Sequence, residues 1–449
     1  MVLKLQKTNK LIDLLTSEEA FCLYIVTCMI AIPLGEFITD LMGKAFVSQP
    51  TIFTIFSILG VFLVTLKISL RPDKRHWSDF FFFTSMIFMF LSLVYSRDIA
   101  RAVRYDINGT NEFPQYFLGY YCLMFAGFQL SKNKLRKIVL YVFIGLSFLE
   151  GILGVFQSFG MRLVEQMHGK DHYGNDIFGL TQNANYFGGL VVLFLGACLG
   201  AALFTKNNKR RVVYIILTLL SVYCSYATLS RSSLLGVGVM ILSYLVMFGV
   251  MHRKYKDNKM YKICFRVLFF GLIGVIGFGV LYVLISQSAM NRVIKTFNEF
   301  KGLFSGDINH FGAGRGYIWT YCIESIPKNW VWGVGLDNLY YCYTSSSHWM
   351  EAMYYSNRAH NVYLHVLTTQ GVFGFANYMA LLITSCVMAV RRILKTDDVE
   401  DRKITWTYFG MIIGYLAVSL LICRVFNVEL YFYAALGAMV PRVHEKVAK

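Results

Sequence analysis

The sequence of 449 residues predicts an all-α, polytopic membrane protein of about twelve transmembrane helices with a large folded extracytoplasmic loop. Three observations lead to this fold class. Hydrophobic residues make up 56% of the chain. Apolar runs of about 20 residues, the length that crosses a bilayer as a helix, recur along nearly the whole sequence. These runs are continuous, whereas the strands of a membrane β-barrel alternate apolar and polar residues, so we expect helices.

The apolar runs define twelve expected spans. No small-residue cleavage site follows the first run, so we interpret it as a retained span and not as a signal peptide. Several runs are short or contain glycine, which leaves eleven or thirteen spans open. The twelve are Ala20–Phe37, Thr51–Leu70, Ser78–Ser96, Gln115–Leu130, Ile138–Gly160, Asn185–Phe204, Val212–Ser230, Ser232–Met251, Ile263–Ile285, Val372–Val390, Ile404–Cys423 and Phe426–Val440.

The basic residues predict the orientation. If the N-terminus lies in the cytoplasm, most of the 43 lysines and arginines fall in short inner connections, such as residues 71–75, 131–137, 205–211 and 252–262. This distribution follows the positive-inside rule and predicts that both termini are cytoplasmic. The net charge of +17 is mostly this bias. Because the cations lie in turns between spans, the charge does not indicate a nucleic-acid partner.

We expect three parts in the chain: residues 1–286 with nine spans, an outer loop over 287–358, and residues 359–449 with three spans and a cytoplasmic C-terminus. The outer loop is richer in Phe, Tyr and Trp than the chain as a whole, in which they make up 16%. A disordered linker is poor in aromatic residues, so we expect short helices against the membrane face. The loop is either a plug or interfacial anchor, or a platform on which sugar rings stack.

Two features of the outer side leave alternatives open. The connection after the third span carries Arg97, Arg101 and Arg104, which contact either lipid headgroups or an anionic ligand. Of the ten cysteines, only Cys322 and Cys342 fall in the large outer loop, where a disulfide between them is one alternative.

Two arginines are candidate functional residues. Arg231, in TLSRSS, separates two apolar runs near the outer boundary, where an ionisable side chain is costly unless it faces a cavity or a partner. The alternative is an arginine that extends to the interface from a helix end. Arg315 follows Gly312 and Gly314 in a glycine-rich turn, where the backbone can approach a ligand closely.

Polar residues also stand at the head of two expected helices. Asn183 and Asn185 open one of them, where each either caps the helix or hydrogen-bonds a sugar or phosphate. Arg358, His360 and Asn361 stand together at the head of the other, which is apolar in the rest of its length and runs into the expected span that begins at Val372.

Four segments in order give the chain a family resemblance. They are GLTQNANY, SRSS, GRGYIW with PKNWVWGVG, and HNVYLHVLTTQGVFG, over residues 179–375. In this order the chain resembles the O-antigen ligase and O-antigen/capsule polymerase superfamily of bacterial membrane glycosyltransferases. Two positions depart from the family pattern: Ala184 replaces a proline that often precedes the asparagine, and Thr369 replaces a glutamate that often precedes the glycine.

The resemblance implies a helical, GT-C-like enzyme that moves a glycan from undecaprenyl diphosphate to a hydroxyl group without a metal or cofactor. It implies an active site outside the bacterial inner membrane. Its implied partners are the lipid-linked donor, the glycan acceptor, membrane lipids, a chain-length regulator and a flippase. The implied site residues are the catalytic Arg231, Arg315 and His360, and the substrate-binding Asn185, Asn361, Arg358 and Tyr363.

The roles follow from ordinary chemistry. Arginine is always charged and binds phosphate oxygens with two parallel hydrogen bonds, so Arg231 and Arg315 are expected to stabilise the departing diphosphate. Histidine can accept a proton near neutral pH, so His360 is the expected base, and the rate should fall as the pH drops through its pKa. Alternatively His360 is a phosphate-binding cation, and Glu324 or Asp337 is the base.

The family leaves two activities open, of which we favour the polymerase over the ligase because the large aromatic loop suits a growing chain. The rival class is a lipid-linked oligosaccharide flippase. A flippase should carry its polar residues deep within spans and have short loops, whereas here they gather on one face beside a long loop. A purely structural membrane protein would need neither the two arginines nor His360.

Overall fold

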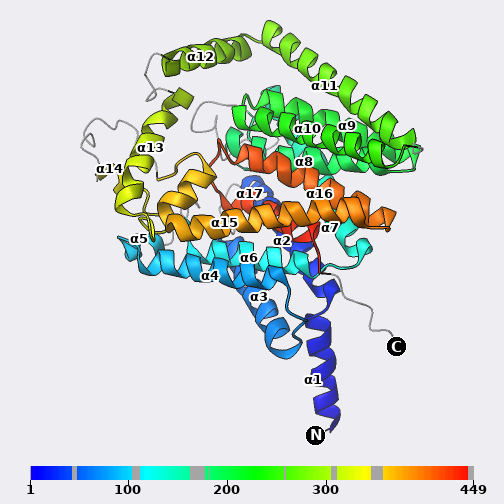
Figure 1. The fold of residues 1–449 in the computed structure, drawn as a ribbon, viewed down its shortest axis with the longest axis vertical. Helices are drawn as coiled ribbons and strands as arrows, with labels where there is room; N and C mark the ends of the chain where they lie inside the picture. Colours follow the sequence, from blue (N-terminus) through cyan, green and yellow to red (C-terminus); the bar gives the residue numbers. More distant parts are fainter. Residues whose placement is uncertain are drawn as a thin grey trace.

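The computed structural model describes residues 2–42, 48–103, 112–161, 177–181, 183–256, 259–304, 311–344 and 357–442, and the regular structure in these ranges is helical (Figure 1). The predicted all-α, polytopic fold class is confirmed. The first nine helices are α1 (Val2–Leu15), α2 (Glu18–Met42), α3 (Gln49–Leu70), α4 (Trp77–Val94), α5 (Ile99–Val103), α6 (Pro114–Phe128), α7 (Asn133–Ser158), α8 (Ala184–Phe204) and α9 (Asn208–Ala227).

The second half of the chain contains the long outer segment and the last five expected spans. Its helices are α10 (Arg231–Lys254), α11 (Lys259–Ile285), α12 (Gln287–Phe304), α13 (Phe311–Ser325), the 3-10 helix η1 (Ile326–Lys328), α14 (Tyr340–Thr344), α15 (Val362–Lys395), α16 (Val399–Val418) and α17 (Phe426–Met439). Each of the twelve expected spans coincides with a helix of the structure.

Within the described residues, nine helices are long and apolar enough to cross a membrane: α2, α3, α4, α7, α8, α9, α10, α11 and α15. The other three expected spans, in α6, α16 and α17, stay predictions. At about 1.5 Å per residue, α6 with 15 residues and α17 with 14 are shorter than a bilayer core of about 30 Å. The first turns of α16 carry charged residues.

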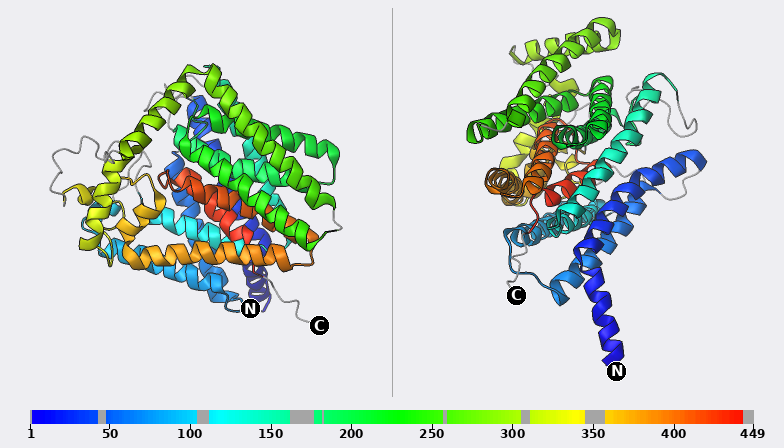
Figure 2. Two further views of the ribbon diagram at one scale, coloured as in Figure 1. Left: turned by 45° about the horizontal axis from the view of Figure 1, so that its top comes forward. Right: turned by 90° about the vertical axis from the view of Figure 1, so that its right-hand side faces the viewer.

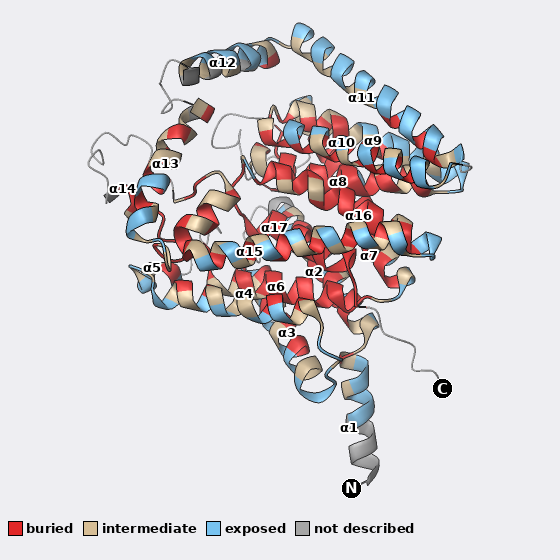
Figure 3. Cartoon of the chain, viewed as in Figure 1, coloured by how far each residue is buried: buried red, intermediate tan, exposed pale blue. Residues whose placement is uncertain are grey.

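The short helices α6 and α17 form the centre of the bundle. All residues of α17 are buried, as are most of α6, and Figure 3 shows buried residues concentrated on these helices and on α8 and α16. A Cβ on Gly127 of α6 would lie 2.6 Å from the backbone nitrogen of Ala438 in α17. Small residues at such a crossing let two helices approach to backbone contact, which is typical of membrane bundles.

The outermost long helix is α11, which runs along the outside of α9 and α10 (Figures 1 and 2). Only 6% of its most apolar stretch is buried inside the protein, and Figure 3 shows the helix as largely exposed. Large apolar side chains such as Phe270 and Leu284 are 67% and 66% exposed. An apolar surface of this kind fits contact with lipid chains.

Helix α15 is broken at Gly371, and the break holds the outer loop in place. Gly371 has φ 70°, and a Cβ there would overlap the backbone of the loop. The break lets the backbone N–H of Val372 donate to the carbonyl of Trp330, at 2.7 Å, and the N–H of Val334 donate to the carbonyl of Thr368, at 2.9 Å. The expected start of a span at Val372 therefore matches the start of the part of α15 that follows the break.

The described part of the outer loop folds into α12, α13, η1 and α14, so the prediction of short helices there is confirmed. In α12 the apolar residues Val293 and Ile294 lie four and three positions before Phe297, and the three side chains are 49%, 51% and 71% exposed. A helix with one exposed apolar face fits a position on the membrane surface. The predicted three-part division of the chain stays a prediction.

Candidate functional site

The polar segments identified in the sequence meet at one end of the bundle. The hydroxyl of Ser230, just before α10, donates to the side-chain oxygen of Asn185 on α8 at 3.2 Å. The start of α15 is joined to the end of α16, since the N–H of Val362 donates to the carbonyl of Ser419 at 2.8 Å. In Figures 1 and 2, α13 lies beside the start of α15. This end therefore contains residues from all four motif segments.

Arg231 has a carboxylate partner. Its guanidinium donates to both carboxylate oxygens of Glu299 on α12, at 2.6 and 3.2 Å. The same carboxylate accepts the backbone N–H of Gly312 at 3.1 Å, in the glycine-rich segment before Arg315. Burial raises the pKa of Glu299, but the hydrogen bond and charge of Arg231 lower it below its ordinary value. Glu299 thus ties Arg231 to the segment of the second candidate arginine.

His360 has a backbone conformation that is uncommon for a side-chain-bearing residue, with φ 51°. Its Nδ1 is 3.2 Å from the sulfur of Cys423, in the connection between α16 and α17. Burial, followed by the positive charges of Arg315 and Arg358, lowers the pKa of His360 to about 3. The imidazole is therefore neutral at physiological pH in the free protein, and it can accept a proton but carries no charge for phosphate.

A buried carboxylate that the sequence analysis did not identify organises the other side of the site. Glu112, just before α6, has a side chain that is 3% exposed. One oxygen is 2.7 Å from Nε2 of His365 and 3.7 Å from Arg358, and the other is 4.0 Å from Arg424. Burial raises the pKa of Glu112, but the charges of His365 and Arg358 hold it below its ordinary range.

Arg358 is shared between two carboxylates, because the same guanidinium nitrogen lies 3.2 Å from Asp337 and 3.7 Å from Glu112. Asp337 is 1% exposed and also accepts hydrogen bonds from the side-chain amide of Asn357 and the backbone N–H of Glu112. These contacts make Asp337 a buried acceptor within the network. Glu324, the other alternative base, is an exposed residue of α13.

The expected substrate-binding residues all have partners within the protein. The side chain of Asn361 caps α15 by accepting the N–H of Leu364 at 3.0 Å, and Asn183 caps α8 in the same way. The hydroxyl of Tyr363 donates to the carbonyl of Leu416 at 2.7 Å. The substrate contacts expected of Asn185, Asn361, Arg358 and Tyr363 stay predictions.

The outer connection after α4 is attached to the large loop. The guanidinium of Arg97 donates to the side-chain oxygen of Asn329 at 3.0 Å, and Arg101 donates to the carbonyl of Asp337 at 3.1 Å. Both arginines thus hold the loop, a role that neither alternative included. Arg104 lies outside the described residues.

The aromatic side chains of the loop are partly structural. The ring of Trp332 stacks on Tyr95 at 4.8 Å and 4°, and Trp330 lies 6.3 Å from Phe373. Trp330 is 54% exposed, so its surface is available for a sugar ring.

The two loop cysteines are buried together. Cys322 and Cys342 belong to one small apolar cluster, and both are free thiols.

A comparison with known families matches a part of the chain that includes three of the candidate residues. Residues 216–379 match the family model described as O-antigen ligase, a range that includes Arg231, Arg315 and His360. Glu112 and Asn185 lie outside it. No curated protein matches the chain. The chain is a multi-pass membrane protein whose residues 216–379 are similar to the O-antigen ligase family, which supports a place in the O-antigen ligase and polymerase superfamily.

Proposed function

We propose that the protein is a membrane glycosyltransferase that polymerises undecaprenyl-diphosphate-linked repeat units into surface polysaccharide. The observation that supports this most is the concentration of arginines around one neutral histidine at one end of the bundle. Arg315 and Arg358 act electrostatically on His360, and Glu299 connects Arg231 to the same segment. Fixed cations suit a leaving group that stays in the membrane, since the transition state develops negative charge on the diphosphate.

In the proposed reaction the acceptor hydroxyl attacks the anomeric carbon of the donor sugar. The bond from this carbon to the diphosphate oxygen breaks, and the undecaprenyl diphosphate leaves with the electron pair. Arg231 and Arg315 stabilise its charge by hydrogen bonds that arginine can make in parallel to phosphate oxygens. To reach the phosphate, Arg231 replaces one of its two hydrogen bonds to Glu299 with a hydrogen bond to a phosphate oxygen.

The proton of the acceptor hydroxyl goes to His360. Because Nδ1 faces the sulfur of Cys423, the base requires the tautomer in which Nδ1–H donates to this sulfur and Nε2 holds the free electron pair. A bound diphosphate adds negative charge beside the ring and raises the pKa of His360 from its low value, which makes the imidazole a better base at the moment of reaction.

The polymerase is favoured by the outer helices α12 to α14 and by the exposed ring of Trp330, which offers a surface to a growing glycan. A second candidate is the ligase, which transfers the finished glycan to lipid A–core, and the description of the matching family favours it. We place the site end of the bundle outside the inner membrane, with both termini in the cytoplasm, because most basic connections then lie inside.

The test uses purified protein in nanodiscs with lipid-linked repeat units, with and without lipid A–core. A ladder of longer glycans and release of undecaprenyl diphosphate from repeat units alone would support the polymerase. Transfer that requires lipid A–core would support the ligase. Translocation of the donor with no new glycosidic bond would overturn both and indicate a flippase. The His360→Ala variant, which is expected to lose both transfer reactions, is the matched control.

A further inference from the structure

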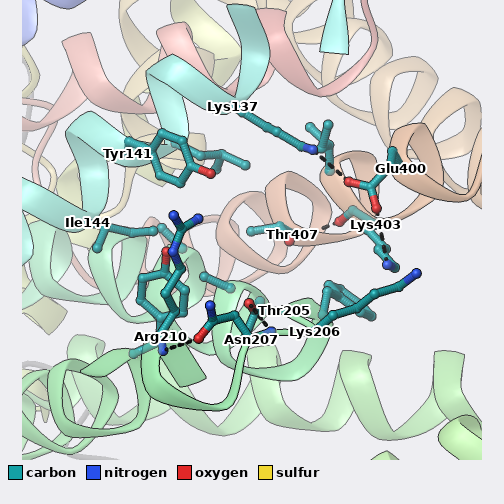
Figure 4. A pocket seen from close by; sticks show the side chains of 17 residues that line it. Lys137, Tyr141, Ile144, Thr205, Lys206, Asn207, Arg210, Glu400, Lys403 and Thr407 are labelled. Carbon is teal, nitrogen blue, oxygen red and sulfur yellow. Dashed lines mark hydrogen bonds and ion pairs between the residues drawn. The ribbon is translucent and has the colours of Figure 1, made fainter. Parts of the chain in front are cut away.

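A cavity with a charged mouth lies at the opposite end of the bundle from the candidate site. It measures about 340 Å³ and lies between α7, α8, α9 and α16 (Figure 4). Helix α8 begins at the candidate site with Ala184 and ends at this cavity with Phe204. Three of the four helices have the length and composition of membrane spans, so the cavity lies where spans end and water begins. The volume is in the range of about 300–1,000 Å³ that is typical of ligand pockets.

The charges at the mouth of this cavity are mostly positive. Lys137, Lys206, Arg210 and Lys403 line it, with Glu400 as the single carboxylate among the lining residues. Figure 4 shows Glu400 between Lys137 and Lys403, with nitrogen–oxygen distances of 2.6 and 3.2 Å. Among the residues that the structure describes, no carboxylate pairs with Lys206 or Arg210. Two cations are therefore left for a ligand of negative charge.

Helix α9 strengthens this positive field. Its first turn carries Lys209, Arg210 and Arg211 and no acidic residue, although the N-terminal end of a helix is itself partly positive. The side chain of Asn207 caps this end by accepting the N–H of Arg210 at 3.1 Å. An anion at the mouth would be stabilised by the helix and by its side chains together.

Below the charged mouth the lining is apolar. Leu140 and Ile144 of α7 face Ala197 and Ala201 of α8, and the small side chains of α8 leave space between the two helices. A simple phosphate would use only the mouth and leave this crevice empty. A molecule with a negative head and an apolar tail matches both parts, as basic pockets between membrane helices do for anionic lipids.

We propose that this cavity binds an anionic glycerophospholipid, with its phosphate at Lys206 and Arg210 and one acyl chain along α7 and α8. The occupant comes from the leaflet at the end of the bundle remote from the glycosyltransferase site. The proposal does not depend on the proposed function, because it rests on a separate set of residues.

The test measures lipid binding by native mass spectrometry of the purified full-length protein titrated with phosphatidylglycerol. The Lys206→Ala/Arg210→Ala variant is expected to bind about 25-fold more weakly, from about a fivefold loss for each cation at a membrane surface. Phosphatidylcholine should bind the unaltered protein weakly. The Ala201→Phe variant, which keeps every cation but fills the crevice, should also lose phosphatidylglycerol.

A matched control is Lys134→Ala/Arg253→Ala, which removes two exposed cations near the same end that do not line the cavity. This variant should bind phosphatidylglycerol like the unaltered protein. Equal loss in the control would mean diffuse surface charge and would overturn the site. Unchanged binding in Ala201→Phe, or displacement of the lipid by glycerol phosphate at similar concentration, would mean an anion site without a lipid tail and would also overturn the proposal.

Discussion

The Glu112→Gln variant tests whether the buried charge network holds the candidate site together. The Glu112 carboxylate faces His365 at 2.7 Å, Arg358 at 3.7 Å and Arg424 at 4.0 Å, and its side chain is 3% exposed. Glutamine keeps the volume and one oxygen but removes the charge. Arg424, whose side chain is also 3% exposed, then loses its nearest carboxylate, while Arg358 keeps Asp337 at 3.2 Å.

Removing one partner of a buried ion pair costs about 3–5 kcal/mol, because the other charge is left without compensation. Since Asp337 remains beside Arg358, we expect the lower end, about 3 kcal/mol. With about 2 °C of change in Tm per kcal/mol for a large chain, Tm should fall by about 6 °C.

The effect should also depend on pH. The pKa of Glu112 is lowered in the folded protein, so the stability from its charge is complete above the ordinary glutamate pKa of about 4.3 and is lost as the pH falls toward the lowered pKa. The difference between Glu112→Gln and the unaltered protein should therefore shrink as the pH falls below about 4.3.

The ten free cysteines provide the assay, because all but Cys386 are buried and react with a thiol-specific dye only on unfolding. The control is Glu19→Gln, which breaks an equally short pair of 2.7 Å with Lys132 whose side chains are 55% exposed. An exposed pair contributes at most about 1 kcal/mol. Equal melting of Glu112→Gln and the unaltered protein, or an equal loss in both variants, would refute the network as a source of stability.

The remaining predictions concern turnover and orientation. Arg231→Ala should lower kcat/KM about a hundred- to thousandfold, and Arg231→Lys should recover little of it; full turnover in Arg231→Ala would exclude a role for this cation. Glu299→Gln should cost less, since the guanidinium remains, and a loss as large as that of Arg231→Ala would show that Glu299 itself is required. The pKa of His360 is lowered to about 3 in the free enzyme, and a bound diphosphate should raise it. Because kcat reports the substrate complex and kcat/KM the free enzyme, kcat should begin to fall at a higher pH than kcat/KM as the solution is acidified. A fall at the same pH for both would argue against a bound diphosphate beside His360. Substantial turnover in His360→Arg with none in His360→Ala would assign phosphate binding to this residue instead of proton transfer. On intact cells, an impermeant thiol reagent should label Lys301→Cys and not Lys209→Cys, and the reverse would invert the orientation.

The helices were predictable from the sequence because membrane helices need long apolar runs. Each expected span coincides with a helix, and the start expected at Val372 matches the break in α15 at Gly371. The helix ends are less exact, since α10 and α15 continue with basic residues beyond the apolar run. A hydropathy pattern reports the apolar part and cannot show how far hydrogen bonding continues beyond it.

The cations of the site were predictable, but their carboxylate partners were not. Arg231 and Glu299 are 68 positions apart, and Glu112 and His365 are 253 apart. Only packing brings such pairs together, and a single sequence contains no signal for it. Glu112 does have one local feature: it is itself a charged residue just before the apolar run of α6, and it is expected at the same membrane boundary as Arg358.

The backbone gives an independent reason to assign function to this end of the bundle. Among the described residues, three other than glycine have a positive φ: Leu229 at 53°, Asp337 at 53° and His360 at 51°. Aspartate and histidine tolerate this conformation better than leucine, and each such residue costs about 1–3 kcal/mol, which contacts in the surrounding structure must offset. All three belong to the candidate site, since Leu229 precedes Ser230 and Arg231, Asp337 pairs with Arg358, and His360 is the proposed base. Strain that collects where the polar segments meet is expected if the fold positions these side chains for a reaction, because packing alone would not require it there.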